Sequence, residues 1–403
     1  MNRLSLVTLC AVVALLAAAC GASSEDDASA DEPTSTTGAP AQMIEPAAGG
    51  IPEGPSALAD RNAEAFPDAL VPVEEIISGG PPPDGIPPLD APVFADIADS
   101  IDELQAAESV VALEINGDAR AYPVRVLIWH EIVNDTVGGV PVSVTYCPLC
   151  NSAVSYRRVV RGVETTFGTS GSLYASALVM YDRLTESLWT HFDGRAIVGV
   201  LAGDQLEPIA SPLMAWVEFV EAYPTGKVLD WTETGFERDY GRNPYEGYDN
   251  PDTDPFLFRG PVDDRERAKQ RVVGISADEV AVAYSMEVIA DGERSVTPAM
   301  VAEQEFVILW QSGQSSALDD SQIGGGDDVG TVGVFIPTLD GVPVTLVTGD
   351  GAFVDEETGS TWSIAGIATG GPLEGSRLER VDHLDTFWFA WSTYRPGTVL
   401  IGG

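Results

Sequence analysis

The chain has 403 residues, of which 62 are Asp or Glu and 21 are Lys or Arg, so its formal net charge is −41. This excess excludes proteins that bind nucleic acid or anionic lipid surfaces, because both need basic patches. We interpret the charge as a means of solubility rather than as an acidic binding face. The length beyond residue 60 is ample for a hydrophobic core and indicates two structural units.

Residues 1–19 have the features of a signal peptide. Arg3 supplies a positive charge, and residues 4–19 form an apolar run shorter than the roughly 20 residues that a membrane-spanning helix needs. Small residues precede Cys20, as at a cleavage site. A cysteine in this place resembles the lipobox of bacterial lipoproteins, in which the thiol is acylated and the chain is cut before it. We therefore expect a protein anchored through Cys20 to the extracytoplasmic face of the cell membrane; an ordinary secreted protein and an uncleaved anchor are the alternatives.

Residues 20–60 are predicted to form a disordered acidic tether. They consist mainly of Ala, Ser, Thr, Pro, Glu and Asp, with almost no large apolar side chain. Such a segment cannot bury enough surface to offset the entropy lost on ordering. We expect it to hold the folded part away from the membrane.

The folded part contains an internal repeat. Residues 110–127 (VVALEINGDARAYPVRVL) resemble residues 272–289 (VVGISADEVAVAYSMEVI), and TESLW is later matched by TGSTW. The matches keep their order and nearly their spacing, which predicts a tandem duplication of about 105–230 and 270–403. The expected domains are a first copy (61–230), an ordered connection rich in Tyr, Pro and Asp (231–271), and a second copy (272–403).

The pattern within each copy is mostly that of strands and turns. Asn116-Gly117 between two alternating runs is typical of a β-hairpin, and VPVSVTY and AVSYRRVV also alternate. Apolar residues recur at three- and four-residue steps only in 211–223 and 383–394, which predicts one short helix near the end of each copy. The expected fold is mostly β (β-rich α+β), with two related barrel- or sandwich-like units.

The two cysteines of the folded part form the most distinctive motif. Cys147 and Cys150 stand in VTYCPLCNSA, directly after a predicted strand, whereas the second copy has Gln311 and Gln314 at the corresponding positions. In a C-P-x-C turn the backbone N–H groups point at the first sulfur, and Asn151 tolerates the positive φ that often follows. The motif resembles the metal knuckle of rubredoxins and zinc ribbons, which use two such knuckles. Further ligands must therefore come from elsewhere.

His130 is the first candidate for a third ligand. If Gly138-Gly139 forms a two-residue turn, the numbers of paired residues sum to 277 and His130 lies opposite Cys147, provided that 129–135 is extended. A neutral imidazole there would bind a metal, and a charged one would lower the pKa of the thiol.

Met180 and His383 are weaker candidates. The thioether of Met180 suits copper(I), and His383, just before FWFAW in the second copy, could reach across the repeat. Residues of both kinds more often fill the core or lie at the surface.

Three readings of the thiol pair remain open. The favoured one is a transition-metal site, with copper preferred over zinc or iron, for metal handling or metal-dependent redox chemistry. The second is a thiol–disulfide oxidoreductase in which Cys147 attacks, Cys150 resolves and His130 tunes the thiol. The third is an inert disulfide in a non-catalytic module that binds a ligand between the copies.

Several motifs together resemble a bacterial domain family of unknown function, DUF3179. They include SGGPPPDGIPPLD, WHEIVND, YCPLCNSAV, FGTSG and MYDRLTESLW, and the resemblance covers about residues 65–403. The family usually has Gly at the position of Asn151 and often has Gln at the position of His191, which argues against His191 as a ligand. The resemblance implies no known reaction or cofactor.

Overall fold

The computed structural model describes residues 50–100 and 104–402. The predicted signal peptide, Cys20 and most of the predicted tether lie outside these residues. No helix in the described part is long and apolar enough to cross a membrane. Residues 50–60, expected in the tether, belong to the folded part, because Ala57 is fully buried and its N–H donates to the carbonyl of Glu186.

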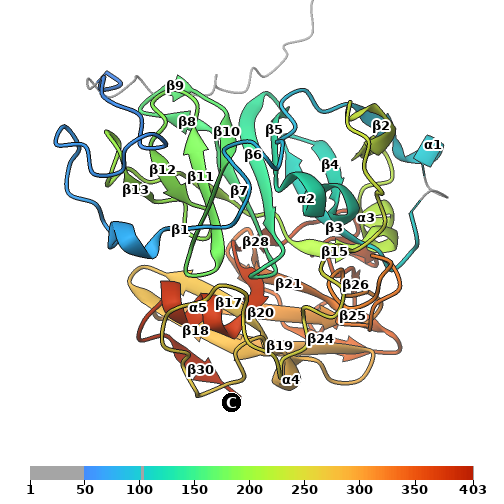
Figure 1. Ribbon diagram of the computed structural model, residues 1–403. Coiled ribbons are helices and arrows are strands. Elements are labelled where there is room, and N and C mark those ends of the chain that lie inside the picture. The colour runs from blue at the N-terminus through green and yellow to red at the C-terminus, as the bar shows by residue number, and fades with distance from the viewer. Residues whose placement is uncertain (1–49, 101–103, 403) are drawn as a thin grey trace, which may run out of the picture. The chain divides into compact units, whose positions relative to one another are not determined.

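The prediction of a mostly β fold is confirmed, with 40% of residues in strands and 10% in helices. The described strands form several open sheets and no closed barrel, so the barrel alternative is wrong. Figure 1 shows most strands up to β16 in the upper part of the view and most strands from β17 onward in the lower part.

Residues 77–229 form three larger sheets and a small hairpin. The first sheet contains, in spatial order, β15 (Leu213–Ala215), β3 (Ser109–Ile115), β4 (Asp118–Pro123), β16 (Lys227–Leu229) and β2 (Phe94–Asp96). The second contains β14 (Pro208–Ile209), β7 (Ser152–Arg157), β6 (Val140–Cys147) and β5 (Ile132–Val137). The third contains β1 (Ile77–Ser78), β10 (Phe167–Tyr174), β11 (Ala177–Asp182), β12 (Leu188–Thr190) and β13 (Ala196–Val198), and the hairpin consists of β8 (Val159–Val160) and β9 (Val163–Glu164).

Residues 271–401 repeat these sheets in the same order, without counterparts of β1 and β2. The first sheet contains β29 (Leu384–Phe387), β17 (Arg271–Ala277), β18 (Val280–Ser285) and β30 (Val399–Ile401). The second contains β28 (Glu379–Arg380), β21 (Thr331–Ile336), β20 (Gln304–Gln311) and β19 (Arg294–Val301). The third contains β24 (Leu346–Gly349), β25 (Ala352–Asp355), β26 (Thr361–Trp362) and β27 (Ala368–Gly370), and the hairpin consists of β22 (Thr338–Leu339) and β23 (Val342–Pro343).

The same turn occurs at matching places in both halves. The carboxylate of Asp182 accepts hydrogen bonds from the backbone and hydroxyl of Thr185 and from the indole of Trp189. Asp355 has the same bonds to Thr358 and Trp362. These parallels agree with a duplication, which itself stays a prediction.

The helices are short: α1 (Ile97–Ser100), α2 (Val124–His130), α3 (Trp216–Ala222), α4 (Met286–Ile289) and α5 (Trp388–Tyr394), with 3-10 turns at Val73–Glu75 and Trp231–Glu233. The helices predicted within 211–223 and 383–394 are α3 and α5. Each begins later than expected because β15 and β29 first pair with β3 and β17.

The predicted hairpins have the expected register. At the first turn Asn116 and Gly117 have φ of 53° and 82°, as a type I′ turn requires, and at the second Val137 pairs with Val140. The expectation of extended backbone over 129–135 is wrong at its start, because α2 ends at His130. Nearly every α2 side chain is buried, so the helix lacks the polar face that would have identified it.

Each late helix covers a turn of the other half. The start of α5 lies on the Cys147–Cys150 turn, where the N–H of Phe387 donates to the carbonyl of Cys150 (3.1 Å). Correspondingly, Glu218 of α3 accepts a bond of 2.9 Å from Gln311, which occupies the equivalent position in the second half. Because each late helix packs on the other half, the thiol pair lies at the junction of the two halves.

The connection 231–271 is ordered and contacts both halves. The hydroxyl of Tyr248 donates to the carbonyl of Leu149 (3.0 Å), and its N–H donates to the carbonyl of Leu318 (3.0 Å). This segment therefore closes over the turn that carries the thiols.

Candidate functional site

The thiols sit on a tight turn between two paired strands. Cys147 ends β6 and pairs with Ser152, the first residue of β7. Asn151 has φ of 47°, and its side-chain oxygen accepts a hydrogen bond of 3.1 Å from the hydroxyl of Tyr146. The left-handed backbone expected after the second cysteine is confirmed, and Asn adds a bond that Gly could not make.

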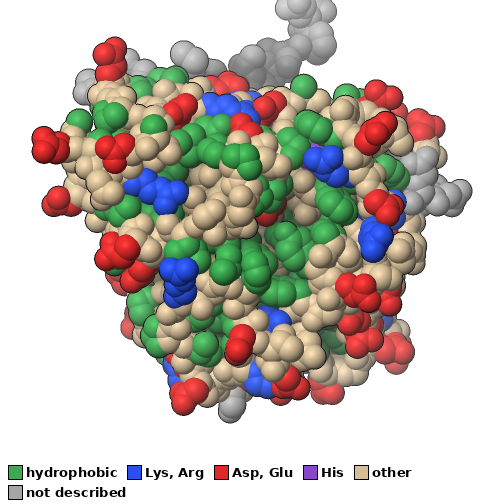
Figure 2. Space-filling model, viewed as in Figure 1, with side chains coloured by type: hydrophobic (Ala, Val, Ile, Leu, Met, Phe, Trp, Pro, Cys, Tyr) green, Lys and Arg blue, Asp and Glu red, His purple; other side chains and the backbone are tan. Residues whose placement is uncertain are grey.

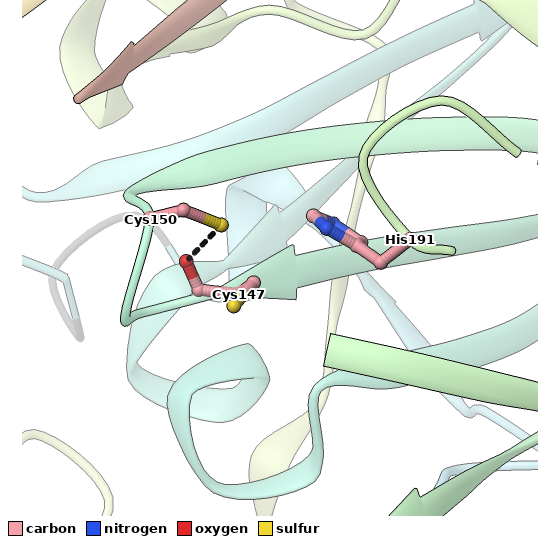
Figure 3. Close-up of side chains that lie close together, drawn as sticks. All are labelled: Cys147, Cys150 and His191. Carbon is pink, nitrogen blue, oxygen red and sulfur yellow. Dashed lines mark hydrogen bonds between the residues drawn. The ribbon is translucent and has the colours of Figure 1, made fainter. Parts of the chain in front are cut away.

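His191, rather than His130, completes the site. It follows β12, where its N–H donates to the carbonyl of Leu178 (3.0 Å) and its carbonyl accepts from the hydroxyl of Tyr156 (2.8 Å). One ligand atom from each of Cys147, Cys150 and His191 lies within 4.8 Å of the others. Figure 3 shows the imidazole pointing toward the sulfur of Cys150. We call these three residues the CCH cluster.

The CCH cluster is closed to solvent, and its imidazole is unpaired. Cys147 is 1% exposed, while Cys150 and His191 are fully buried. Neither ring nitrogen of His191 has a hydrogen-bond partner, and burial lowers its pKa to about 3. An unpaired buried polar group costs about 1–3 kcal/mol, and a bound water or ion or a redox or catalytic role is the kind of explanation it requires. The group facing this ring is the thiol pair.

The two sulfurs are free and have opposite pKa shifts. Burial raises the pKa of Cys147, but a hydrogen bond from the Cys150 thiol and the N–H groups of Leu178, Cys150 and Leu149 together bring it below its ordinary value. Burial and the neighbouring Cys147 raise the pKa of Cys150 well above its ordinary value. The turn therefore favours the thiolate on Cys147, as expected for a knuckle.

The second half holds the turn but supplies no ligand atom to the CCH cluster. The hydroxyl of Thr386 on β29 donates to the carbonyl of Cys150 (2.7 Å), beside the bond from Phe387. Cys150 is also held from its own strand, since its sulfur lies 2.7 Å from the hydroxyl of Ser152. These bonds fix the direction of the Cys150 side chain.

Glu131 is a chemically important neighbour that the motif analysis did not select. It has φ of 58°, and its N–H donates to the carbonyl of Leu127, which ends α2. Burial and the nearby Cys147 raise its pKa to about 8. The sequence could have drawn attention to Glu131, because the second copy has no counterpart of residues 129–131.

His130 lies outside the CCH cluster. Its Nδ1 is 2.7 Å from the carbonyl oxygen of Pro87, and its Nε2 is 2.5 Å from the hydroxyl of Tyr240. The register argument fails because the chain turns at Glu131, so that the paired positions begin only at Ile132. The ring connects α2 to the Pro-rich loop before it and to the 231–271 connection.

Met180 lies in the core that surrounds the thiols, whereas His383 is not part of the CCH cluster. Met180 is fully buried on β11 within the hydrophobic core that also contains Cys147 and Cys150. His383 precedes β29, and its Nδ1 lies 2.9 Å from the carbonyl oxygen of Val381. Met180 is thus a core residue near the site, whereas His383 is tied to its own loop.

Comparison with known proteins identifies the family. A family model described as a protein of unknown function, DUF3179, matches residues 83–398. The chain belongs to the DUF3179 family. No curated protein and no solved structure matches the chain.

Several polar residues of the DUF3179 motifs have structural roles. Asn134 donates to Asp90 (2.7 Å) and to the carbonyl of Phe167 (2.8 Å), and Asp135 pairs with Arg120 (2.7 Å). These residues hold β5 against the neighbouring sheets.

The shape and charge of the site limit its chemistry. Two sulfurs and one imidazole are soft or intermediate ligands, and the enclosure leaves little room for an organic substrate.

Figure 2 shows Asp and Glu side chains spread over the visible face rather than gathered in one patch. This distribution agrees with the interpretation of the net charge as a means of solubility.

Proposed function

We propose that the CCH cluster binds one thiophilic transition-metal ion, with Cys147, Cys150 and His191 as its protein ligands. The observation that carries this proposal is the fully buried imidazole of His191, which faces two free sulfurs and has no partner on either nitrogen. An ion would satisfy one nitrogen and both sulfurs at once. Metals bind thiolates and neutral imidazoles, and the low pKa of His191 keeps its ring neutral at physiological pH.

We favour copper(I) as the ion. Structural zinc sites almost always have four protein ligands, whereas the described His, Cys, Asp and Glu residues supply three here. Soft thiolates select copper(I), which is stable with three ligands. A closed three-ligand site suits the storage or transfer of the ion, or of an electron, better than hydrolysis of a substrate.

We also propose that the protein acts outside the cytoplasm, anchored to the membrane through Cys20. The support comes from the apolar run at 4–19 and the small residues before Cys20. A lipid anchor would hold a metal-handling domain at the cell surface.

The direct test is the metal content of the full chain, isolated from its native membrane without chelators. We expect about one copper per chain in the natural protein and in His383→Gln, and almost none in His191→Gln and Cys147→Ser. Stoichiometric zinc or iron with the same mutational pattern would keep the site and change the ion. A metal-free protein that also fails to take up copper(I) would contradict the proposal.

The second candidate function is thiol–disulfide exchange. It is favoured by the lowered pKa of Cys147 beside the raised pKa of Cys150, a pattern suited to an attacking and a resolving thiol. Against it, both thiols are closed to a protein substrate, and a strand rather than a helix follows Cys150. A metal-free protein whose two thiols are oxidised and reduced reversibly would favour this candidate.

A further inference from the structure

A closed metal site needs a route of entry, and two cavities lie at the junction of the two halves. The larger, of about 670 Å³, lies between the loop after β12 and the β17–β18 turn, and the smaller, of about 240 Å³, lies between the loop after β26 and the end of β3. Each contains an equivalent bridge between strands, Arg195 to Gln205 in the larger and Ile367 to Arg377 in the smaller. The two cavities therefore occupy equivalent places in the repeated fold.

Of these two cavities, only the larger is lined by the loop that continues from His191. The loop that lines it continues directly from His191 through the buried Phe192 to Asp193, which lines the cavity. In the second half the equivalent loop, residues 363–367, contains neither histidine nor cysteine. The half with the thiols thus has the cavity that is nearly three times larger.

A pair of stacked rings links the lining of this cavity to the residue that follows His191. Tyr394, which lines the cavity, stacks on Phe192 with ring centroids 4.5 Å apart and an interplanar angle of 18°. The hydroxyl of Tyr394 donates to the carbonyl of Tyr174 (3.1 Å) and holds the ring in place. Rotation of the two side chains would open this wall without disturbing a strand.

The other walls are held by hydrogen bonds to main-chain groups. Tyr248 binds the carbonyl of Leu149, Phe387 and Thr386 bind that of Cys150, and Leu178 binds the backbone of His191. Opening any of these walls would require the turn or a strand to move. Of the stacked rings, Tyr394 has one such bond, to the carbonyl of Tyr174, and the Phe192 ring has none.

We propose that the larger cavity is the entry route to the CCH cluster and that Phe192 and Tyr394 form its gate. This inference rests on the proposed metal-binding function and specifies how the ion arrives. The ion enters alone or with small ligands, since the cavity of about 670 Å³ admits a small molecule and the stacked rings exclude a protein loop.

The test compares two substitutions at equivalent positions, each of which places a Trp side chain in one of the two cavities. Ser276 lines the larger cavity on β17, and Glu114 lines the smaller one at the same position of β3, since Ser276 pairs with Ala281 as Glu114 pairs with Ala119. We expect Ser276→Trp to slow both copper(I) loading and the reaction of the metal-free thiols with a small disulfide reagent by at least tenfold. Glu114→Trp should change both rates less than twofold, and the final copper content should stay the same in both variants.

A third variant should open the gate, so the thiol reaction should become faster rather than slower. Phe192→Ala removes half of the stack and should speed the thiol reaction at least fivefold in protein whose circular dichroism matches the natural chain. Equal rates in Ser276→Trp and the natural protein, or equal slowing by both Trp substitutions, would overturn the proposed route. A chain that binds no copper but shows the expected thiol rates would refute the metal function and keep the route.

Discussion

At the scale of single residues, His191 and Glu131 are polar groups whose burial is costly in a protein without a bound ion. Both are buried, and burial shifts both toward their neutral forms, to pKa values of about 3 and about 8. In addition, neither ring nitrogen of His191 has a hydrogen-bond partner. Such groups weaken the fold unless something else binds them, which links the stability of this protein to its ligand.

His191→Leu should therefore stabilise the metal-free protein while abolishing its response to metal. Removing an unpaired imidazole relieves about 1–3 kcal/mol, partly offset by imperfect packing of the new side chain. Thermal unfolding with and without a chelator measures both effects. A natural protein that unfolds at the same temperature with and without copper(I) would contradict the expectation.

Glu131 should make the metal-free protein less stable as the pH rises from about 4.5 to about 8. The folded state holds the proton up to the raised pKa, whereas the unfolded state releases it near 4.5, so the stabilisation is complete below 4.5 and is lost as the pH passes through 8. Glu131→Gln should remove this dependence. The measurement is the free energy of unfolding in urea at pH 5, 6.5 and 8, and a difference between the two proteins that is constant with pH would refute it.

At the scale of elements, the CCH cluster depends on two turns that come from different parts of the chain. The β6–β7 turn presents the sulfurs, and the Asp182 turn directs β12 so that His191 faces them. The first turn is readable in the sequence, as C-P-L-C-N. The second has an equivalent at Asp355, which allows a matched comparison.

Asp182→Asn and Asp355→Asn should each destabilise the protein by about 1–3 kcal/mol, because each carboxylate accepts bonds from a threonine and a buried indole. Only Asp182→Asn should also weaken copper(I) binding, because β12 carries His191. Competition with a copper(I) chelator measures the affinity. Equal losses of affinity in the two variants would show that the turns matter for folding alone.

Thr386→Val should weaken metal binding although it lies in the second half. The change removes the 2.7 Å bond to the carbonyl of Cys150 and leaves only the bond from the N–H of Phe387. Loss of such a supporting contact typically lowers metal affinity by about 10–100-fold. Thr393→Val is the control, since its hydroxyl bonds within α5 to the carbonyl of Phe389.

At the scale of the whole molecule, the two halves are alike in fold and unlike in chemistry. The position of the cysteines in one half is taken by Gln311 and Gln314 in the other, where the amide of Gln311 binds Glu218. Each late helix covers the turn of the other half, so neither turn is complete within its own copy. The second half thus acts as a support for a single asymmetric site.

The proposed anchor at Cys20 also concerns the whole molecule. Cys20→Ala should release the protein from membranes into the soluble extracytoplasmic fraction, because a chain without the acylated cysteine loses its lipid. Cell fractionation and incorporation of labelled fatty acid measure this outcome. Continued membrane association without labelling would indicate an uncleaved apolar segment instead.

The sequence by itself determined the family, the mostly β fold, both hairpin registers and the place of the thiol pair. These features depend on local patterns, such as alternation, Asn-Gly and Gly-Gly turns, and C-P-L-C-N, and neighbouring residues suffice to specify them. The two late helices were also recognisable, because apolar residues recur at three- and four-residue steps in 211–223 and 383–394.

Only the tertiary structure decided which histidine joins the thiols. The buried helix α2 resembles a strand in its composition, and its end at a left-handed Glu131 turns His130 toward Pro87 and Tyr240. His191 lies 41 residues beyond Cys150 in the sequence and reaches it through β10, β11 and β12. Its unpaired nitrogens, the cavity beside it and the support from Thr386 all arise from packing between distant segments, which no local pattern records.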